Sequence, residues 1–475
     1  MCGIIGVYGD KKTSLTIQKG LFAVQHRGQD FYGLTCTNGE NYSPMDNAIK
    51  KVGLVDIATP IILDGHAGIG HVRYSTQGHN NEKNAQPHSA KIYENLIWLA
   101  SNGDVTNAKA LRKELIENGI PIETENDAEI IVKFIAWHYT KTNDLITAIH
   151  QAMEKIHGAF SAVLLTKDAL YAFRDLYGFR PLEMGIRPDG AVMFASETVA
   201  LDVCDFIFEK ELAPGEIIKI NQNGIKYFPF LNNSNPLSQC HFELVYFSHP
   251  DAMVFGIPVK LFRRKLGEGL ARLNLEQSQK ITQGNNMYRN CFVAPIPDSS
   301  NAIAQGFANY PICPLPFELM ITRSHYVGRT FIQPGILRDL DVDLKFTFNP
   351  YLYRGKIVIL IDDTIVRGNT VKKIVSRTRE ICQVDEVHIR ISDPPIRYAC
   401  HFGIDLHEKE KKELIASIMG VEEICQFIGA NSLIYNTIEN LQATIRECGG
   451  NPQDFCYACL NGEYKCPLPD YQEAT

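Results

Sequence analysis

The segment Val358-Ile-Leu-Ile-Asp362-Asp363-Thr364-Ile-Val-Arg367-Gly368-Asn369-Thr370 decides the fold of the second half of the chain. It predicts a buried strand over 356–361, two carboxylates where the strand ends, and a helix from about residue 370 to 381. Further strands are predicted at 290–295 and 386–391, and further helices at 259–273 and 303–308. This alternation is typical of a parallel sheet, in which ligands bind at the carboxyl ends of the strands.

The loop after the strand has the composition of a phosphate and metal site. Asp362 and Asp363 at the strand end can hold ribose hydroxyls and organise Mg²⁺. The backbone amides that follow face a helix N-terminus, which favours phosphate, together with the side chains of Thr364, Arg367, Asn369 and Thr370. The alternative is an ordinary Asp-initiated turn with a helix cap, which the length of the full segment disfavours.

The chain opens with Met1-Cys2-Gly3-Ile4-Ile5-Gly6-Val7. If Met1 is removed, which the small side chain of Cys2 permits, Cys2 carries both a thiol and a free α-amino group. An α-amino group with a pKa near ~8 can accept the thiol proton near neutral pH. Nucleophile and base would then lie on one residue. The alternative is a small buried cysteine in a first strand.

Residues 1 to about 230 alternate short apolar strands with glycine-rich turns. Two helical stretches, at 14–26 and 127–140, interrupt them, which predicts an α+β domain with antiparallel sheets. The polar segment 231–238 indicates a linker. The chain therefore divides into three predicted regions: residues 2–230, residues 231–440, and a Cys-rich tail of residues 441–475 that packs against the second domain.

Composition and charge exclude several classes of function. The chain is 45% hydrophobic and 21% charged, with a formal net charge of −7, which argues against general binding to nucleic acid or a membrane surface. No run approaches the ~20 apolar residues of a membrane span, and no basic region precedes an apolar stretch at the N-terminus. We therefore expect a cytoplasmic protein whose thirteen cysteines form no disulfides.

Two segments resemble known families. The segment 358–370 resembles the 5-phosphoribosyl-1-pyrophosphate (PRPP) signature of type I phosphoribosyltransferases, and Cys2-Gly3-Ile4 resembles the class II glutamine amidotransferases, whose nucleophile is a processed N-terminal cysteine. A chain with the N-terminal cysteine segment first and the PRPP signature second resembles the amidophosphoribosyltransferase family. The resemblance covers nearly the whole chain. The other matching segments are 25–30, 70–76, 102–103, 174–182, 297–300 and 326–334.

The resemblance implies a fold, an activity and an assembly. The fold is an N-terminal-nucleophile αββα sandwich, which is α+β, followed by an α/β type I phosphoribosyltransferase domain with a doubly wound parallel sheet. The activity converts glutamine, PRPP and water to 5-phosphoribosylamine, glutamate and pyrophosphate, the first committed step of de novo purine synthesis. The family also implies Mg²⁺ as a cofactor, purine nucleotides as effectors and a homotetramer.

The family's functional residues carry over to matching positions. Cys2 attacks the glutamine carboxamide, and the Asn102 side chain and the Gly103 N–H stabilise the oxyanion. Arg73 pairs with the glutamine α-carboxylate, and Asp127 holds its α-ammonium. As isolated residues, Arg73 would more often be salt-bridged and Asp127 a helix cap. At the second site the implied PRPP-binding residues are Thr364, Arg367, Gly368, Asn369 and Thr370, and the implied Mg²⁺ ligands are Ser299, Asp362 and Asp363.

The two implied sites require a protected connection. Ammonia in water at neutral pH is almost wholly ammonium, which cannot attack C1 of PRPP. The sites must therefore share a water-excluded path that is completed when PRPP binds. The expected closing element is the charged segment 321–346.

One branch of the family holds a [4Fe–4S] cluster, and its four ligands match Cys240, Cys400, Cys456 and Cys459. Thiolates from such distant segments would hold the tail against the second domain. The alternatives are no metal, or a zinc site from the more closely spaced Cys448, Cys456, Cys459 and Cys466. The cluster is favoured because Cys240 and Cys400 also match.

Some positions depart from the family's pattern: Arg323, His325 and Asp343 in the closing segment, Phe31 and Tyr32 after the 25–30 match, and Ser101 before Asn102. Asp343 stands where an arginine is expected, which inverts a charge near a tetra-anionic substrate. These departures keep two alternatives open. One is a regulatory protein that binds PRPP or nucleotides, and the other is a glutaminase that serves a different ammonia acceptor.

Overall fold

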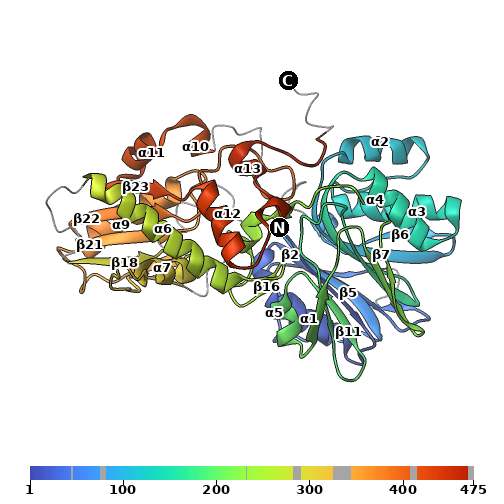
Figure 1. Cartoon of the computed structure of the whole chain (residues 1–475). Helices are drawn as coiled ribbons and strands as arrows, with labels where there is room; N and C mark the ends of the chain where they lie inside the picture. The colour runs from blue at the N-terminus through green and yellow to red at the C-terminus, as the bar shows by residue number, and fades with distance from the viewer. Residues whose placement is uncertain are drawn as a thin grey trace.

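The computed structural model describes residues 1–43, 47–74, 82–231, 233–281, 290–324, 344–406 and 414–468. The first half of the chain forms one lobe and the second half another, and the two meet near the N-terminus (Figure 1). Among the helices in these ranges, none has the length and apolar character that crossing a membrane requires.

Two antiparallel sheets form the N-terminal domain, in the orders β12-β10-β11-β1-β5-β2-β3, with β4 paired to β2, and β14-β13-β9-β8-β7-β6. The strands of the first sheet are β1 (Gly3–Tyr8), β2 (Phe31–Thr37), β3 (Tyr42–Ser43), β4 (Ile49–Val52), β5 (Ala67–Arg73), β10 (Glu183–Ile186), β11 (Val192–Ala195) and β12 (Ile207–Glu211). Those of the second are β6 (His88–Ile92), β7 (Asn95–Val105), β8 (Gly158–Leu165), β9 (Ala169–Arg174), β13 (Ile217–Asn221) and β14 (Gly224–Phe228).

Helices cover the outer face of each sheet. On the first sheet lie α1 (Thr13–Ala23) and α5 (Thr198–Val203), and on the second lie α3 (Asp127–Thr142) and α4 (Leu145–Lys155), with α2 (Ala108–Glu117) against α3. Buried side chains such as Ile4, Ile69, Leu170 and Phe194 fill the space between the sheets. The expected αββα sandwich is confirmed, although α2, α4 and α5 were not predicted.

A parallel sheet in the order β18-β21-β22-β23 forms the centre of the C-terminal domain. Its strands are β18 (Cys291–Pro295), β21 (Ile357–Asp362), β22 (Glu386–Ile391) and β23 (Ser432–Tyr435), and its main helices are α6 (Val259–Ile281), α7 (Asn301–Ala308), α9 (Asn369–Cys382) and α11 (Val421–Ile428). Val358 and Leu360 pack with α9 and α11, whereas Ile359 and Ile361 pack with α6 and α7. Both faces of β21 are therefore buried, which explains its continuous apolar run and confirms the predicted α/β domain.

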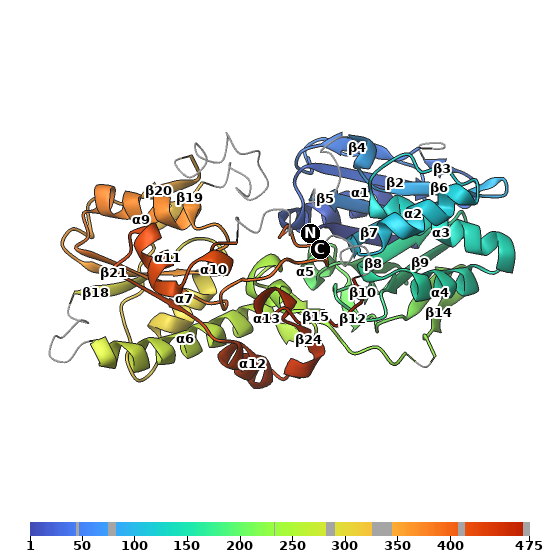
Figure 2. The ribbon, with the colours of Figure 1, turned by 90° about the horizontal axis from the view of Figure 1, so that it is seen from above.

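Smaller elements lie around these two domains. They are β15 (Gln239–Cys240) paired in parallel with β24 (Phe455–Cys456), the hairpins of β16 (Met253–Val254) with β17 (Ile257–Pro258) and β19 (Ile321–Arg323) with β20 (Phe346–Phe348), and the helices α10 (Ile415–Ile418), α12 (Ile438–Glu447) and α13 (Ala458–Asn461). Figures 1 and 2 both show α12 and α13 near the junction of the lobes. The helix α12 packs on α6 and spans the predicted boundary between residues 440 and 441.

Candidate active site

Cys2 stands at the start of β1, a central strand that pairs with β5 on one side and β11 on the other. Its backbone N–H donates to Asn102 Oδ1 at 2.9 Å, and its carbonyl oxygen accepts from Arg27 Nε at 2.9 Å. The backbone N–H of Tyr74 lies 3.5 Å from the Cys2 Sγ. The thiol is only half-buried, so the backbone is fixed while the sulfur remains accessible.

Asn102 and Gly103 lie side by side on β7, opposite Ser161 and Phe160 of β8. Asn102 is fully buried, and within the described residues its Nδ2 has no hydrogen-bond partner. Because Oδ1 already accepts the hydrogen bond from the Cys2 backbone N–H, Nδ2 remains as a buried donor on a side chain that contacts Cys2. A Cβ at Gly103 would lie 1.8 Å from the Ala159 carbonyl oxygen, so only glycine fits there. The pair can therefore supply two donors to an oxyanion.

The two residues expected to bind the glutamine substrate are Arg73, at the end of β5, and Asp127, in the first turn of α3. Arg73 ends β5, is buried, and has its guanidinium carbon 5.8 Å from the centre of the Phe31 ring. Burial lowers its pKa, and the nearby Cys2 and Asp30 oppose this shift. Asp127 Oδ2 accepts the Val105 N–H at 2.8 Å, and burial raises the pKa of this carboxyl.

The alternative role of Asp127, as a helix cap, belongs to the preceding residue. The residue that caps α3 is Asn126, whose side chain accepts the Ala128 N–H. Asp127 follows in the first turn and is turned toward the end of β7, the strand that carries Asn102. A helix cap therefore does not account for Asp127.

A buried charge network, which the sequence analysis missed, joins Cys2 to the C-terminal domain. The Arg27 guanidinium contacts Glu197 Oε1 at 2.5 Å and Glu243 Oε1 at 2.8 Å, and Glu243 also lies 3.3 Å from Arg180 Nη1. All four side chains are fully buried. Burial opposes the charge of Arg27, but the two carboxylates raise its pKa overall. Arg27 and Arg180 lie in matching segments, whereas no sequence pattern points to Glu197.

The second cluster of polar groups lies at the carboxyl edge of the parallel sheet. Asp362 ends β21 and Asp363 opens the loop to α9, which begins at Asn369 after the N-cap Gly368. Ser300 Oγ donates to Asp362 Oδ1 at 3.3 Å, and Ser299 hydrogen-bonds to Asp363.

Burial raises the pKa of both carboxyls, and Asp363 raises that of Asp362 further. A pair of buried, adjacent carboxyls is costly to ionise without a cation. Carboxylate and hydroxyl oxygens are the ligands that Mg²⁺ prefers. The chemistry of this donor set therefore fits a magnesium ion.

A cavity of about 910 Å³ lies at this second cluster and extends to the N-terminal domain at His26 and Gln29, but Cys2, Asn102 and Gly103 are not among its lining residues. From the N-terminal domain it is lined by His26 and Gln29, which flank Arg27. From the C-terminal domain it is lined by Ser299, Asp362, Asp363, Thr364, Arg367, Gly368, Asn369 and Thr370, and by the further cations Lys260, Arg263, Arg323, Lys345 and Lys373. Carboxylates at one point and many cations around them suit a polyphosphate that carries a divalent metal.

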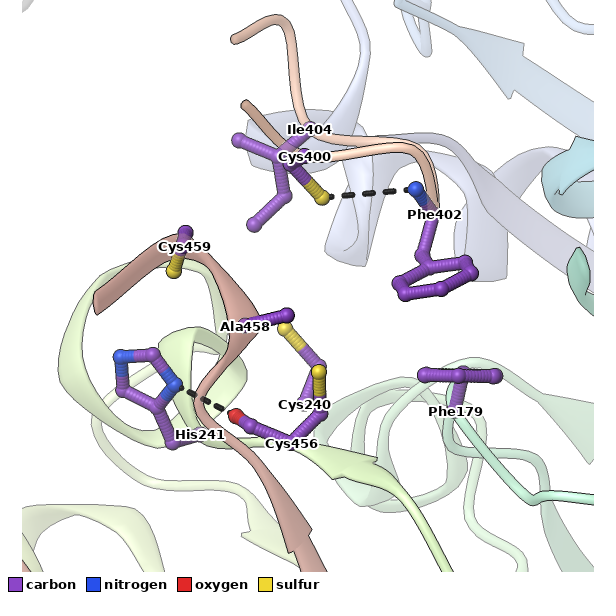
Figure 3. Close-up of a pocket in the computed structure, with 9 residues that line it drawn as sticks. All are labelled: Phe179, Cys240, His241, Cys400, Phe402, Ile404, Cys456, Ala458 and Cys459. Atoms are coloured by element: carbon purple, nitrogen blue, oxygen red, sulfur yellow. Dashed lines mark hydrogen bonds between the residues drawn. The ribbon is translucent and has the colours of Figure 1, made fainter. Parts of the chain in front are cut away.

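Cys240, Cys400, Cys456 and Cys459 line one smaller cavity, closed on one side by Phe179 and Phe402 (Figure 3). The parallel pairing of β15 with β24 sets Cys240 beside Cys456. Burial raises the pKa of Cys240 to about 11 and that of Cys456 to about 12. No group of three or more His, Cys, Asp or Glu side chains among the described residues has a geometry ready to hold a metal ion. Cys448 and Cys466 of the alternative zinc set do not line this cavity.

The departures from the family's pattern are only partly described. Arg323, on β19, donates to Asp298 Oδ2 at 2.7 Å, whereas His325 and Asp343 lie outside the described residues. Ser101 N–H donates to Gln86 Oε1 at 2.7 Å, and Phe31 and Tyr32 are buried on β2. Ser101 therefore has a structural role next to Asn102.

Comparisons with known proteins cover the same regions. Residues 71–203 match a family model described as a glutamine amidotransferase domain. The chain is 40% identical to amidophosphoribosyltransferase 1 (chloroplastic) of Arabidopsis thaliana over 98% of this chain and 78% of the relative. It is 37% identical to the amidophosphoribosyltransferase of Methanocaldococcus jannaschii over 98% and 97%.

A solved structure of a relative has the same fold over the whole chain. The glutamine PRPP amidotransferase from B. subtilis, complexed with ADP and GMP, aligns with a TM-score of 0.85 at 34% identity, covering 100% of this chain and 99% of that one. The identity to these relatives is above 30% over nearly the full length of this chain and so includes both domains. The chain belongs to the amidophosphoribosyltransferase family.

Proposed function

We propose that this chain converts glutamine, PRPP and water to 5-phosphoribosylamine, glutamate and pyrophosphate, the first committed step of de novo purine synthesis. The observation that carries the proposal is that one chain holds both the Cys2–Asn102 arrangement and the Asp362–Asp363 loop, and that the cavity at this loop is also lined by His26 and Gln29 of the N-terminal domain. A regulatory PRPP-binding protein would have no use for the Cys2 and Asn102 arrangement. A glutaminase that serves another acceptor would have no use for the carboxylate pair.

The first half-reaction centres on Cys2. Its sulfur attacks the glutamine amide carbon, the thiol proton passes through the α-amino group to the leaving nitrogen, and ammonia departs to leave a thioester that water hydrolyses. Asn102 Nδ2 and the Gly103 N–H would bind the developing oxyanion. Arg73 would pair with the substrate α-carboxylate and Asp127 with its α-ammonium.

The surroundings of the N-terminus favour a neutral amine. Burial, with a contribution from Arg180 and Arg27, lowers the pKa of the Met1 α-amino group to about 5. An amine in this environment is uncharged at neutral pH and can accept a proton.

The second half-reaction takes place at the carboxyl edge of the parallel sheet. Ser299, Asp362 and Asp363 would hold Mg²⁺, which when bound neutralises charge on the pyrophosphate leaving group. Thr364, Arg367 and the amides from Gly368 to Thr370 would hold the 5-phosphate at the start of α9. Ammonia then forms a bond to C1 of PRPP as the bond to pyrophosphate breaks.

Transfer of ammonia between the halves follows from its chemistry. Only the neutral molecule is a nucleophile, so it must cross the cavity without being protonated by bulk water. His26 and Gln29 stand at the glutaminase end of that cavity, and Asp362 stands at the other. The closing segment lies largely outside the described residues, apart from β19 and the stretch around β20.

The proposed activity has a direct assay. With glutamine, PRPP and Mg²⁺, the purified chain should release glutamate and pyrophosphate in equal amounts. Glutamate release with PRPP left unconsumed would favour the glutaminase alternative. PRPP binding by calorimetry without turnover would favour the regulatory one.

We further propose that the four-cysteine cavity holds a [4Fe–4S] cluster. The support is the chemistry of the donor set, since three buried cysteines and the partly buried Cys456, from three separate segments, converge on one cavity. Thiolates without a metal would be unfavourable there, because burial raises the pKa of each. The reaction has no redox step, so the group would fix the tail to the C-terminal domain.

Anaerobic purification should therefore give a brown protein with about four irons per chain. Cys456→Ser should lose the iron and unfold at a lower temperature, because the tail loses its attachment. Cys448→Ser is the matched control from the same tail and should keep both properties. An iron-free protein with stoichiometric zinc that is lost in Cys448→Ser would contradict the cluster.

The assembly, effectors and location follow the family. We propose a homotetramer in the cytoplasm whose substrates are glutamine and PRPP. Purine nucleotides are proposed as effectors, and the relative from B. subtilis was solved as a complex with ADP and GMP. Size-exclusion chromatography with light scattering checks the assembly.

A further inference from the structure

Residues 392–406, named here the connector, touch every functional region of the molecule. They leave the end of β22, pass the four-cysteine cavity, and reach the wall of the large cavity. Figure 3 shows Cys400, Phe402 and Ile404 on this one segment. The connector belongs to the C-terminal domain, but part of it lies against the N-terminal domain.

At its first end the connector holds the PRPP loop. The Ser392 N–H donates to the Asp362 carbonyl at 3.0 Å, and the Asp393 N–H donates to the Asp363 carbonyl at 2.9 Å. Ser392 and Asp393 are fully buried. The backbone of the carboxylate pair is therefore tied to the connector rather than to solvent.

The middle of the connector is fixed to the tail. The Arg397 and Tyr398 N–H groups both donate to the Cys459 carbonyl, at 3.0 and 3.1 Å. Phe402 stacks on Phe179 of the N-terminal domain, with ring centres 4.3 Å apart. The segment is thus held between the two domains and is not a free loop.

At its other end the connector reaches the glutaminase strand. A Cβ at Gly403 would lie 3.3 Å from Arg180 Nη2, 3.3 Å from the carbonyl carbon of Gly103 and 3.5 Å from its Cα. The Phe402 carbonyl accepts hydrogen bonds from Arg180 Nε, at 3.1 Å, and from Arg180 Nη2. Gly403 therefore lies against the residue whose N–H is the proposed oxyanion donor.

The residues that follow Gly403 face the PRPP side. Ile404 lines both the four-cysteine cavity and the large cavity, and Leu406 lines the large cavity. The Cys400 N–H donates to the Leu406 carbonyl at 2.8 Å, which closes the end of the connector into a compact turn. Gly403 and the residues of the cavity wall therefore belong to one turn.

We propose that Gly403 is a positioning residue for glutamine hydrolysis, through which occupancy of the PRPP pocket sets the Gly103 oxyanion donor. This inference rests on the proposed function and adds a structural connection between the sites of its two half-reactions. PRPP bound against Ile404, Leu406 and the braced Asp362–Asp363 backbone fixes the connector. The fixed connector holds Gly103 where its N–H meets the oxyanion.

The test is Gly403→Ala, assayed for glutamine hydrolysis with and without PRPP. The added methyl group presses on the Gly103 backbone and on Arg180 Nη2. We expect the Gly103 backbone to shift by a few tenths of an ångström, so kcat for glutamine hydrolysis with PRPP should fall about tenfold. The KM for glutamine should not change, because the oxyanion forms only in the transition state. The ammonium-supported rate should stay within about twofold, since the transferase groups are untouched.

Gly449→Ala is the matched control. Gly403 has φ = +99° and Gly449 has φ = +88°, so both substitutions strain the backbone, but a Cβ at Gly449 meets no atom within 4 Å. If the two variants behave alike, or if Gly403→Ala lowers the glutamine and ammonium rates equally, the proposal is wrong.

If Gly403→Ala fails to fold, the proposal can still be tested on the unsubstituted protein. Hydrogen–deuterium exchange should show that Mg²⁺ and PRPP slow exchange in the peptides that contain Gly103 and Gly403. Unchanged exchange at Gly103 would overturn the proposal. Absence of ammonium-supported turnover in the unsubstituted protein would instead overturn the proposed function.

Discussion

Replacing Cys2 with alanine is expected to lower glutamine-supported synthesis of 5-phosphoribosylamine by about 10⁴-fold or more, because no other group can form the thioester. The ammonium-supported rate should stay within about twofold, since Asp362 and its neighbours are unchanged. Alanine is small enough to allow removal of Met1, so the N-terminus is still processed. Pyrophosphate release with each nitrogen donor measures the effect.

The control for this substitution is Cys36→Ala, on β2 of the same sheet. Cys36 is fully buried, and burial raises the pKa of its thiol to about 12, so it stays protonated and takes no part in catalysis. Cys36→Ala should keep both rates. A Cys2→Ala protein that still uses glutamine, or that loses both rates together, would contradict the assignment of the nucleophile.

Asp362→Asn is expected to lower the rates with both nitrogen donors by roughly 10²- to 10³-fold. The substitution removes one carboxylate of a pair whose pKa values are raised by burial and, at Asp362, also by repulsion from Asp363. That repulsion is the free energy that a bound Mg²⁺ would relieve, so the variant should also bind Mg²⁺ and PRPP more weakly by calorimetry. Glutamine hydrolysis without PRPP should not change.

Asp385→Asn is the control for this prediction. Asp385 precedes β22 at the opposite edge of the same sheet, where its N–H donates to the Lys356 carbonyl. The same chemical change there should leave both rates within about twofold. Loss of only the glutamine-supported rate in Asp362→Asn would be evidence against the carboxylate pair as the PRPP–Mg²⁺ site.

Local sequence signals were enough to predict the strand and helix around the PRPP loop. The apolar run before Asp362 gave β21, and the helix predicted from residue 370 begins at Asn369. Of the helices that were not predicted, α2 and α4 do have local signals in the sequence. Asp144 caps α4 by accepting the Thr147 N–H, and Leu111 and Leu115 form the buried face of α2.

Strand order in the N-terminal domain could not be read from the sequence. Ile5 lies opposite Gly70 on one side and Ala195 on the other, and these pairings depend on the packing of the whole domain. Residues that act through long-range contacts were missed for the same reason. Glu197 contacts Arg27 from 170 positions away, and Gly403 meets Gly103 only because the two domains pack together.

The central claim is that Cys2 acts as an N-terminal nucleophile. The direct measurement is mass spectrometry of the active protein after reaction with a glutamine analogue that alkylates the active-site nucleophile. We expect the first residue to be Cys2, with a free α-amino group and the label on its sulfur. A protein that hydrolyses glutamine while Met1 is still present, or that carries the label on another residue, would contradict it.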